Sequence, residues 1–159
     1  MSDPFILSFS RTIPATPEVV WRCWTDTELL KQWFAPAPVV VSEAEMDVRP
    51  GGQFRTVMQV PDHGEMAGAP GCVLVADVAQ RLVWTNALGP DFRPNEMGSG
   101  PMDFGFTADI RMAPDPQGCA YTVTVLHATE EGAKTHESIG FFDGWGAAAD
   151  QMAALAKTL

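Results

Sequence analysis

The stretch "GFFDGWGAAADQMAAL", Gly140–Leu155, decides the fold because it carries one continuous helical stripe. Its large and small apolar residues recur at the three- and four-residue spacing of one helix face: Phe141, Trp145, Ala148, Met152 and Leu155. Asp143, Asp150 and Lys157 fall on the opposite side. We therefore predict a long amphipathic helix from about Gly140 to Lys157, with its stripe packed on a larger apolar surface.

The same stretch places Gly144 and Gly146 on either side of Trp145. Each glycine costs a helix interior roughly 1 kcal/mol relative to alanine. Burial of an indole contributes roughly 4–6 kcal/mol as an upper estimate, so the helix forms despite its glycines. The missing side chains have two possible uses. They allow close packing of neighbouring backbone, or they leave space for a ligand beside the indole.

The N-terminal part predicts one strand followed by two short helices. "FILSFSRTI", Phe5–Ile13, alternates larger apolar residues with smaller or polar ones, which is typical of a strand. Thr16 is a good N-cap, and Pro17 suits the first helical position. A second helix begins at another capping residue, Asp26 or Thr27.

The middle of the chain, from residue 39 to 128, predicts strands joined by turns. The expected strands cover residues 39–48, 53–60, 72–78, 81–88, 104–112 and 120–128. Strands connected this tightly in series favour an antiparallel sheet. The segments 61–71 and 89–103 predict loops, because they are rich in glycine and proline.

Composition indicates a globular protein, which we interpret as one domain over residues 1–159. The net charge of −10 and only ten Lys and Arg residues argue against nucleic acid and anionic membrane surfaces as partners. No apolar run is long enough to insert into a membrane, and the N-terminus does not resemble a signal peptide. Cys23, Cys72 and Cys119 are widely spaced, which favours free buried thiols and a cytoplasmic location.

Five segments together resemble a known family. They are "RTIPATPEVVWRCWTD" (Arg11–Asp26), "LLKQWFAP" (Leu29–Pro36), "DVRPGGQFR" (Asp47–Arg55), "RLVWT" (Arg81–Thr85) and "GFFDGWGAAADQMAAL". In this order they resemble the homologues of the activator of the ninety-kilodalton heat-shock chaperone's ATPase, within the START-related (SRPBCC) superfamily. The resemblance implies an α+β helix-grip (START-like) fold. In that fold a curved antiparallel sheet of six or seven strands grips the long C-terminal helix around a largely apolar cavity.

The function that the resemblance implies is binding of a small hydrophobic or amphipathic molecule in this cavity. The residues that we expect to line it are Met58, Trp84, Phe104, Phe106, His127, Trp145 and Met152. Aromatic and methionine side chains suit a plastic pocket, but they suit a solid core equally well. We expect the segment 89–103 to form a mobile flap without regular pairing near the cavity mouth.

Two other functions stay open. The first is an enzyme of the cyclase or hydrolase type, in which a polar residue such as His127 or Asp77 acts on a bound hydrophobic substrate. The sequence does not assign a catalytic residue. The second is an interaction module, in which the sheet surface binds the chaperone. We expect no stimulation of the chaperone's ATPase, because the eukaryotic activator's separate chaperone-binding domain has no counterpart before the first strand.

Several polar residues have both a chemical and a structural interpretation. His63 and Glu65 have no third metal ligand at suitable spacing, so we expect a solvated loop, no metal and no cofactor. His127, His136 and Glu137 form either an acid–base group at the cavity mouth or the polar residues of a surface connection. Alternation along its strand places the side chain of Arg55 on the outer face.

Overall fold

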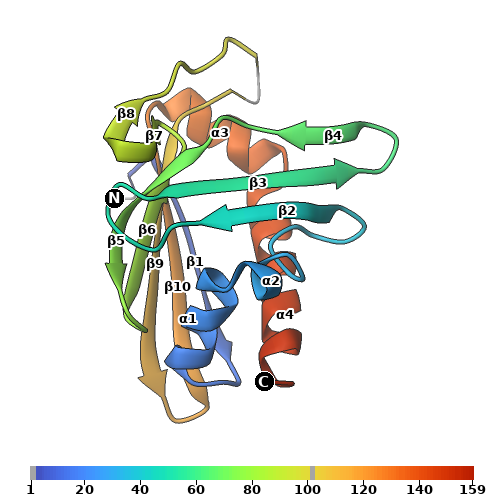
Figure 1. The fold of residues 1–159 in the computed structure, drawn as a ribbon, viewed down its shortest axis with the longest axis vertical. Coiled ribbons are helices and arrows are strands. Elements are labelled where there is room, and N and C mark those ends of the chain that lie inside the picture. The colour runs from blue at the N-terminus through green and yellow to red at the C-terminus, as the bar shows by residue number, and fades with distance from the viewer. Residues whose placement is uncertain (1–2, 101–102) are drawn as a thin grey trace.

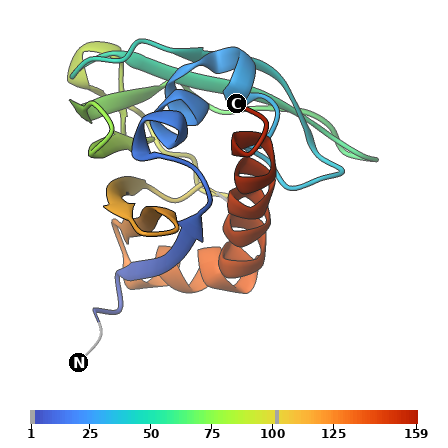
Figure 2. The same ribbon diagram turned by 90° about the horizontal axis from the view of Figure 1, so that it is seen from below.

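The computed structural model describes residues 3–100 and 103–159. The main sheet is built from eight strands: β1 (Ile6–Ile13), β2 (Val40–Met46), β3 (Gln53–Val60), β4 (Gly64–Ala67), β5 (Gly71–Asp77), β6 (Arg81–Thr85), β9 (Phe106–Asp115) and β10 (Gly118–His127). The helices are α1 (Pro17–Thr25), α2 (Thr27–Leu30), α3 (Glu130–Ser138) and α4 (Phe141–Ala156). Figure 1 shows α4 running alongside the sheet, and Figure 2 shows it along the open side of the curl.

The sheet is antiparallel throughout, in the order β1-β10-β9-β6-β5-β3-β2, with β4 added to β3. Strands β3 and β5 share only two register pairs, so β2–β4 cross the other strands steeply (Figure 1). Register shifts at Val41/Glu43 and Val73/Val75 mark irregularities of the kind that bend strands. The predicted curved sheet around a C-terminal helix is therefore confirmed.

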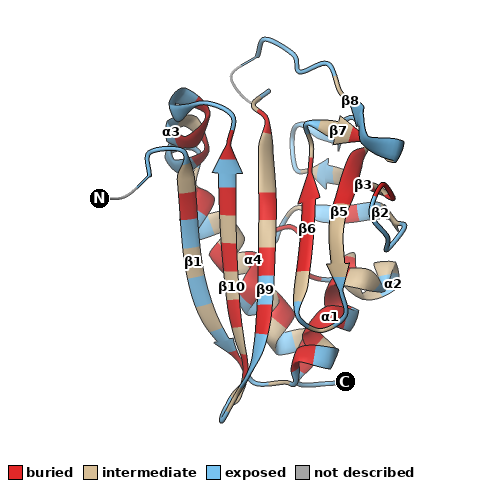
Figure 3. Ribbon diagram, turned by 90° about the vertical axis from the view of Figure 1, so that its left-hand side faces the viewer, coloured by how far each residue is buried: buried red, intermediate tan, exposed pale blue. Residues whose placement is uncertain are grey.

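Capping residues start the helices as the sequence predicts. The Thr16 hydroxyl accepts a hydrogen bond from the Val19 amide at 3.3 Å, and the Asp26 carboxylate accepts one from the Glu28 amide at 3.0 Å. Along α4, Phe141, Ala148 and Met152 are buried, whereas the acidic face is exposed. Figure 3 shows alternating buried and less buried bands along β10 and β9, because successive side chains face opposite sides of the sheet.

Two elements, β4 and α3, differ from the predictions made from the sequence. Residues 64–67, predicted within a loop, form β4, whose backbone groups extend the ladder of β3. The connection after β10 contains α3, which is capped by the Thr129 hydroxyl accepting from the Gly132 amide at 2.9 Å. Only one side of this short helix is buried, so its apolar pattern is too weak to predict from periodicity.

The segment 89–103 was expected to lack regular pairing, and this is wrong for its first part. β7 (Leu88–Gly89) pairs with β8 (Arg93–Pro94) across the short 3-10 helix η1 (Pro90–Phe92). The Asn95 side chain donates hydrogen bonds to the carbonyls of Pro70 and Asn86, both at 2.9 Å. The side chain of Asn95 therefore ties this glycine-rich segment to the neighbouring chain by hydrogen bonds. Residues 101 and 102 lie outside the described part, and the mobility of the segment stays a prediction.

Candidate ligand-binding cavity

A cavity of about 690 Å³ lies between α4 and the inner face of the sheet. Its aromatic walls come from α1, the segment after α2, strands β3, β6, β9 and β10, and α4: Trp24, Trp33, Phe34, Phe54, Trp84, Phe106, Tyr121 and Trp145. Smaller apolar residues, including Met58, Met66 and Ala148, complete the walls. This volume and lining are those of a small-molecule site.

Trp84 lies at the centre of the aromatic wall. Its ring meets that of Phe54 nearly edge to face at a centroid distance of 4.7 Å, and that of Phe106 at 5.5 Å. The Trp145 ring is nearly parallel to it, with centroids 6.3 Å apart. Such mutual contacts fix the rings and stabilise the wall. Trp84 Nε1 is occluded and has no hydrogen-bond partner within residues 3–100 and 103–159, which leaves a buried donor unsatisfied at this wall.

The predicted site residues divide into two groups. Met58, Trp84, Phe106 and Trp145 lie together on the cavity wall, although they come from three strands and a helix. The other three lie outside the wall: Phe104 packs on the His136 ring, His127 lies behind His136, and Met152 is fully buried in the core. Whether any of the seven contacts a ligand stays a prediction.

Several wall residues were not predicted as site residues, chiefly Trp24, Trp33, Phe34, Phe54 and Tyr121. In the sequence, "WRCW" and "QWF" indicate buried helix faces and give no sign that one side faces a cavity. The density of aromatic residues just before the segment 35–38 is the available signal. The segment 35–38 forms no helix or strand that would pack over these aromatic rings, so one side of them can face a cavity.

The two glycines beside Trp145 have different surroundings. A Cβ atom added at Gly144 would meet no atom within 4 Å, and this residue lines the cavity. A Cβ atom at Gly146 would lie 2.7 Å from Arg11 Nη2. Space and packing therefore each account for one glycine: Gly144 leaves room beside the indole, and Gly146 accommodates the arginine of β1.

A pair of buried histidines connects the N-terminal segment to the cavity. His127 Nδ1 lies 2.9 Å from the Phe5 carbonyl oxygen, and His127 Nε2 lies 2.9 Å from His136 Nδ1. Burial, with a smaller contribution from His127, lowers the pKa of His136 to about 4. His136 is therefore neutral near pH 7. Glu137, the third member of the predicted acid–base group, is exposed and makes no hydrogen bond to the pair.

Hydrogen bonds fix other parts of the cavity wall. Trp24 Nε1 donates to Tyr121 Oη at 3.1 Å, which joins α1 to β10, and burial raises the pKa of Tyr121. Gln151 of α4 binds the segment after α2: its Nε2 donates to the carbonyls of Trp33 and Ala35 at 3.0 and 2.8 Å. Its Oε1 accepts from the Ala37 amide at 2.9 Å. These bonds hold the segment after α2 against α4.

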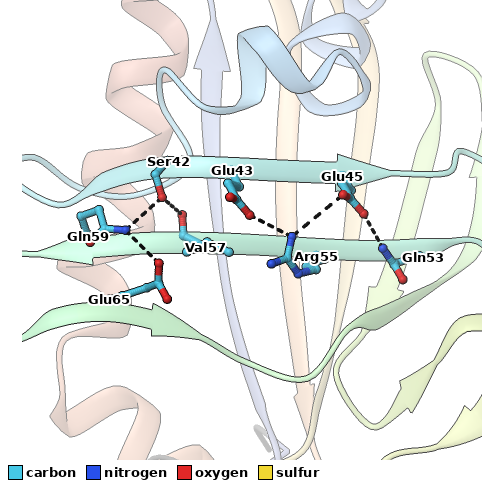
Figure 4. A network of polar contacts seen from close by, with 8 residues as sticks. All are labelled: Ser42, Glu43, Glu45, Gln53, Arg55, Val57, Gln59 and Glu65. Carbon is cyan, nitrogen blue, oxygen red and sulfur yellow. Dashed lines mark hydrogen bonds and ion pairs between the residues drawn. The ribbon is translucent and has the colours of Figure 1, made fainter.

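The polar network on β2–β4 lies on the outer face of the sheet (Figure 4). Arg55 Nη1 pairs with Glu43 at 3.1 Å, but Arg55 is also among the residues that line the cavity, so the predicted outward orientation holds for its guanidinium group and not for the whole residue. Glu65 accepts a hydrogen bond from Gln59 at 3.4 Å, and His63 is exposed. In the described part of the chain, no group of three or more His, Cys, Asp or Glu residues is arranged to hold a metal ion.

The other polar candidates lie away from the cavity. Asp77 is exposed at the turn between β5 and β6 and does not line the cavity. The three cysteines are buried and free, as expected. Burial raises the pKa of Cys23 to about 11, so this thiol is protonated at neutral pH and is a poor nucleophile.

These features define a class of protein: a curled antiparallel sheet around a long C-terminal helix, enclosing an aromatic cavity. The chain belongs to the family described as Activator of Hsp90 ATPase homolog 1-like protein, which it matches over residues 14–157. No curated protein matches it. Within the described residues, no helix is long and apolar enough to cross a membrane.

Solved structures of similar fold come from several bacteria. A protein of Nitrosomonas europaea is 36% identical, with a TM-score of 0.91 over 99% of this chain and 97% of its own. A protein of Rhodobacter sphaeroides is 20% identical, with a TM-score of 0.83 over 100% and 97% of the two chains. An Arthrobacter aurescens protein is 19% identical, with a TM-score of 0.78 over 100% and 91%. The last two similarities concern the fold alone.

Proposed function

We propose that this protein binds a small hydrophobic or amphipathic molecule in the cavity between α4 and the sheet. The observation that carries the proposal is the cavity of about 690 Å³ with walls built mainly from aromatic rings. Membership in a family that commonly binds hydrophobic ligands supports it. The Trp84 Nε1–H is occluded and offers a ligand no donor, but the polar residues Thr56 and Asn86 border the cavity, so a ligand with one polar atom suits it better than a pure hydrocarbon.

A simple aromatic hydrocarbon is nevertheless the cleanest first probe. An aromatic group that buries about 150–250 Å² gains roughly 4–6 kcal/mol, before the cost of association is subtracted. Without that cost, the gain corresponds to a Kd between about 1 mM and 40 μM, so we expect weak binding, on the order of millimolar. Naphthalene is a suitable probe because it has no group that other surfaces of the protein would bind by charge.

The test is a calorimetric titration of naphthalene into the native protein and two variants. Gly144→Leu places an isobutyl group in the open space at the cavity wall, so we expect at least tenfold weaker binding. Ala154→Leu places the same side chain on the exposed face of α4 and controls for the effect of a leucine on this helix. We expect this control to bind like the native protein. Equal affinity in all three proteins, or no binding by the native protein, would overturn the proposed function.

A further inference from the structure

The histidine pair has only one arrangement of protons when both rings are neutral. The Phe5 carbonyl oxygen can only accept, so His127 Nδ1, at 2.9 Å, carries the proton. His127 Nε2 is then the acceptor, and His136 Nδ1 must donate to it across their 2.9 Å contact. In neutral His136 the other nitrogen, Nε2, is consequently left with a free lone pair.

This lone pair belongs to a ring that lines the cavity. The His136 ring is 8% exposed and lines the cavity wall. Its Nε2 has no hydrogen-bond partner within residues 3–100 and 103–159, yet it is not among the occluded atoms, unlike Trp84 Nε1. The rings of Phe104, Phe106 and Phe141 pack around it at centroid distances of 4.8, 5.4 and 4.9 Å, and none of them can donate a proton. His136 is thus an unpaired acceptor among aromatic rings, in a cavity whose lining also includes the polar residues Arg55, Thr56 and Asn86.

We propose that the ligand carries a neutral hydroxyl group, phenolic or alcoholic, that donates a hydrogen bond to His136 Nε2. This inference rests on the proposed function, because it concerns the same cavity. The ordered chain from the Phe5 carbonyl through His127 fixes which nitrogen of His136 faces the ligand, which makes His127 a positioning residue. A carboxylate would find no donor at this position: its oxygens only accept, and a neutral His136 offers them a lone pair.

Three probes of similar shape separate these ligand classes: naphthalene, 2-naphthol and 2-naphthoate. With the native protein we expect 2-naphthol to bind about three- to tenfold more tightly than naphthalene, which is the typical effect of one net hydrogen bond. We expect 2-naphthoate to bind most weakly. In a His136→Phe variant the advantage of 2-naphthol over naphthalene should disappear.

A second measurement needs no variant. Nitrogen-15 NMR of the native protein distinguishes protonated from bare ring nitrogens, and we expect His136 to carry its proton on Nδ1. Addition of 2-naphthol should shift the Nε2 resonance much further than addition of naphthalene, which cannot donate a hydrogen bond to it. A proton on Nε2, or equal affinity for 2-naphthol and naphthalene, would overturn this inference and leave the proposed function standing. Tightest binding of 2-naphthoate would overturn it in favour of a cationic His136. Binding of none of the three probes would overturn both.

Discussion

At the scale of single residues, the glycines beside Trp145 provide a matched pair. Gly144→Ala removes the helix penalty of glycine, and its methyl group enters open space, so we expect stabilisation of up to about 1 kcal/mol. The same methyl group reduces the cavity and should weaken naphthalene binding. Thermal unfolding and calorimetry on the same preparation check both effects, and a loss of stability would show that the space beside Gly144 is filled.

Gly146→Ala is the control for this substitution. Its methyl group must displace Arg11 Nη2, the tip of a flexible side chain whose Nε makes a weak surface contact to Asp150 at 3.7 Å. The helix gain and the lost contact offset each other, so we expect stability to change by less than about 0.5 kcal/mol. Naphthalene binding should be unchanged, since Gly146 does not line the cavity.

Protonation of His136 should couple stability to pH. Its pKa lies at about 4 in the folded protein, against 6.5 for an ordinary histidine. Between these values the unfolded chain binds more protons, so the free energy of unfolding falls as pH drops from 6.5 to 4, by up to about 3 kcal/mol. Chemical denaturation at several pH values should show this slope in the native protein and lose it in His136→Phe.

His63→Gln, which changes an exposed histidine, should keep the dependence of stability on pH.

The carboxylate of Asp109 affects stability in a lower pH range than His136. Burial raises its pKa, but hydrogen bonds from Arg81 and Arg111 outweigh this and lower it below the ordinary value of 3.8. The stabilisation by ionised Asp109 is therefore lost only below pH 3.8. If the free energy of unfolding falls equally between pH 6.5 and 4 in His136→Phe and in the native protein, the assignment to His136 is contradicted.

At the scale of elements, the bond between Trp24 and Tyr121 joins α1 to the sheet. Tyr121→Phe keeps the ring but leaves the buried Trp24 Nε1–H without its acceptor, so we expect destabilisation of about 1–3 kcal/mol. Urea denaturation measures the change. On the same strand, Thr122 shares a 3.2 Å contact with Ser10 at an exposed position, and Thr122→Val should cost less than about 0.5 kcal/mol. Equal effects of the two substitutions would show that the buried bond contributes nothing.

Elements with strong periodicity or good caps could be predicted from the sequence. The stripe of α4 and the caps at Thr16 and Asp26 are local signals, and each appears in the structure. The elements that could not be predicted depend on distant partners. β4 exists because β3 offers it a free edge, and α3 is held by contacts of His136 with His127 and the aromatic rings.

At the scale of the whole molecule, order and periodicity of elements were enough to predict an antiparallel sheet with a C-terminal helix packed on it, and the family resemblance implied the curvature of the sheet. The contents of the space between them could not be predicted, because apolar residues look alike in a sequence whether they border a cavity or fill a core. Met58 and Met152 illustrate this: both are apolar residues in periodic elements, yet Met58 lines the cavity and Met152 is buried in the core. Only the three-dimensional arrangement separates them.

The most direct test of the account uses the methionine methyl groups as reporters of where a ligand binds. Met58 and Met66 line the cavity, whereas Met112 and Met152 are buried outside its wall. In protein with carbon-13-labelled methionine methyls, titration with naphthalene should shift the Met58 and Met66 signals saturably and leave that of Met112 in place. The absence of any saturable shift, or shifts at Met112 and not at Met58 and Met66, would contradict a ligand-binding cavity between α4 and the sheet.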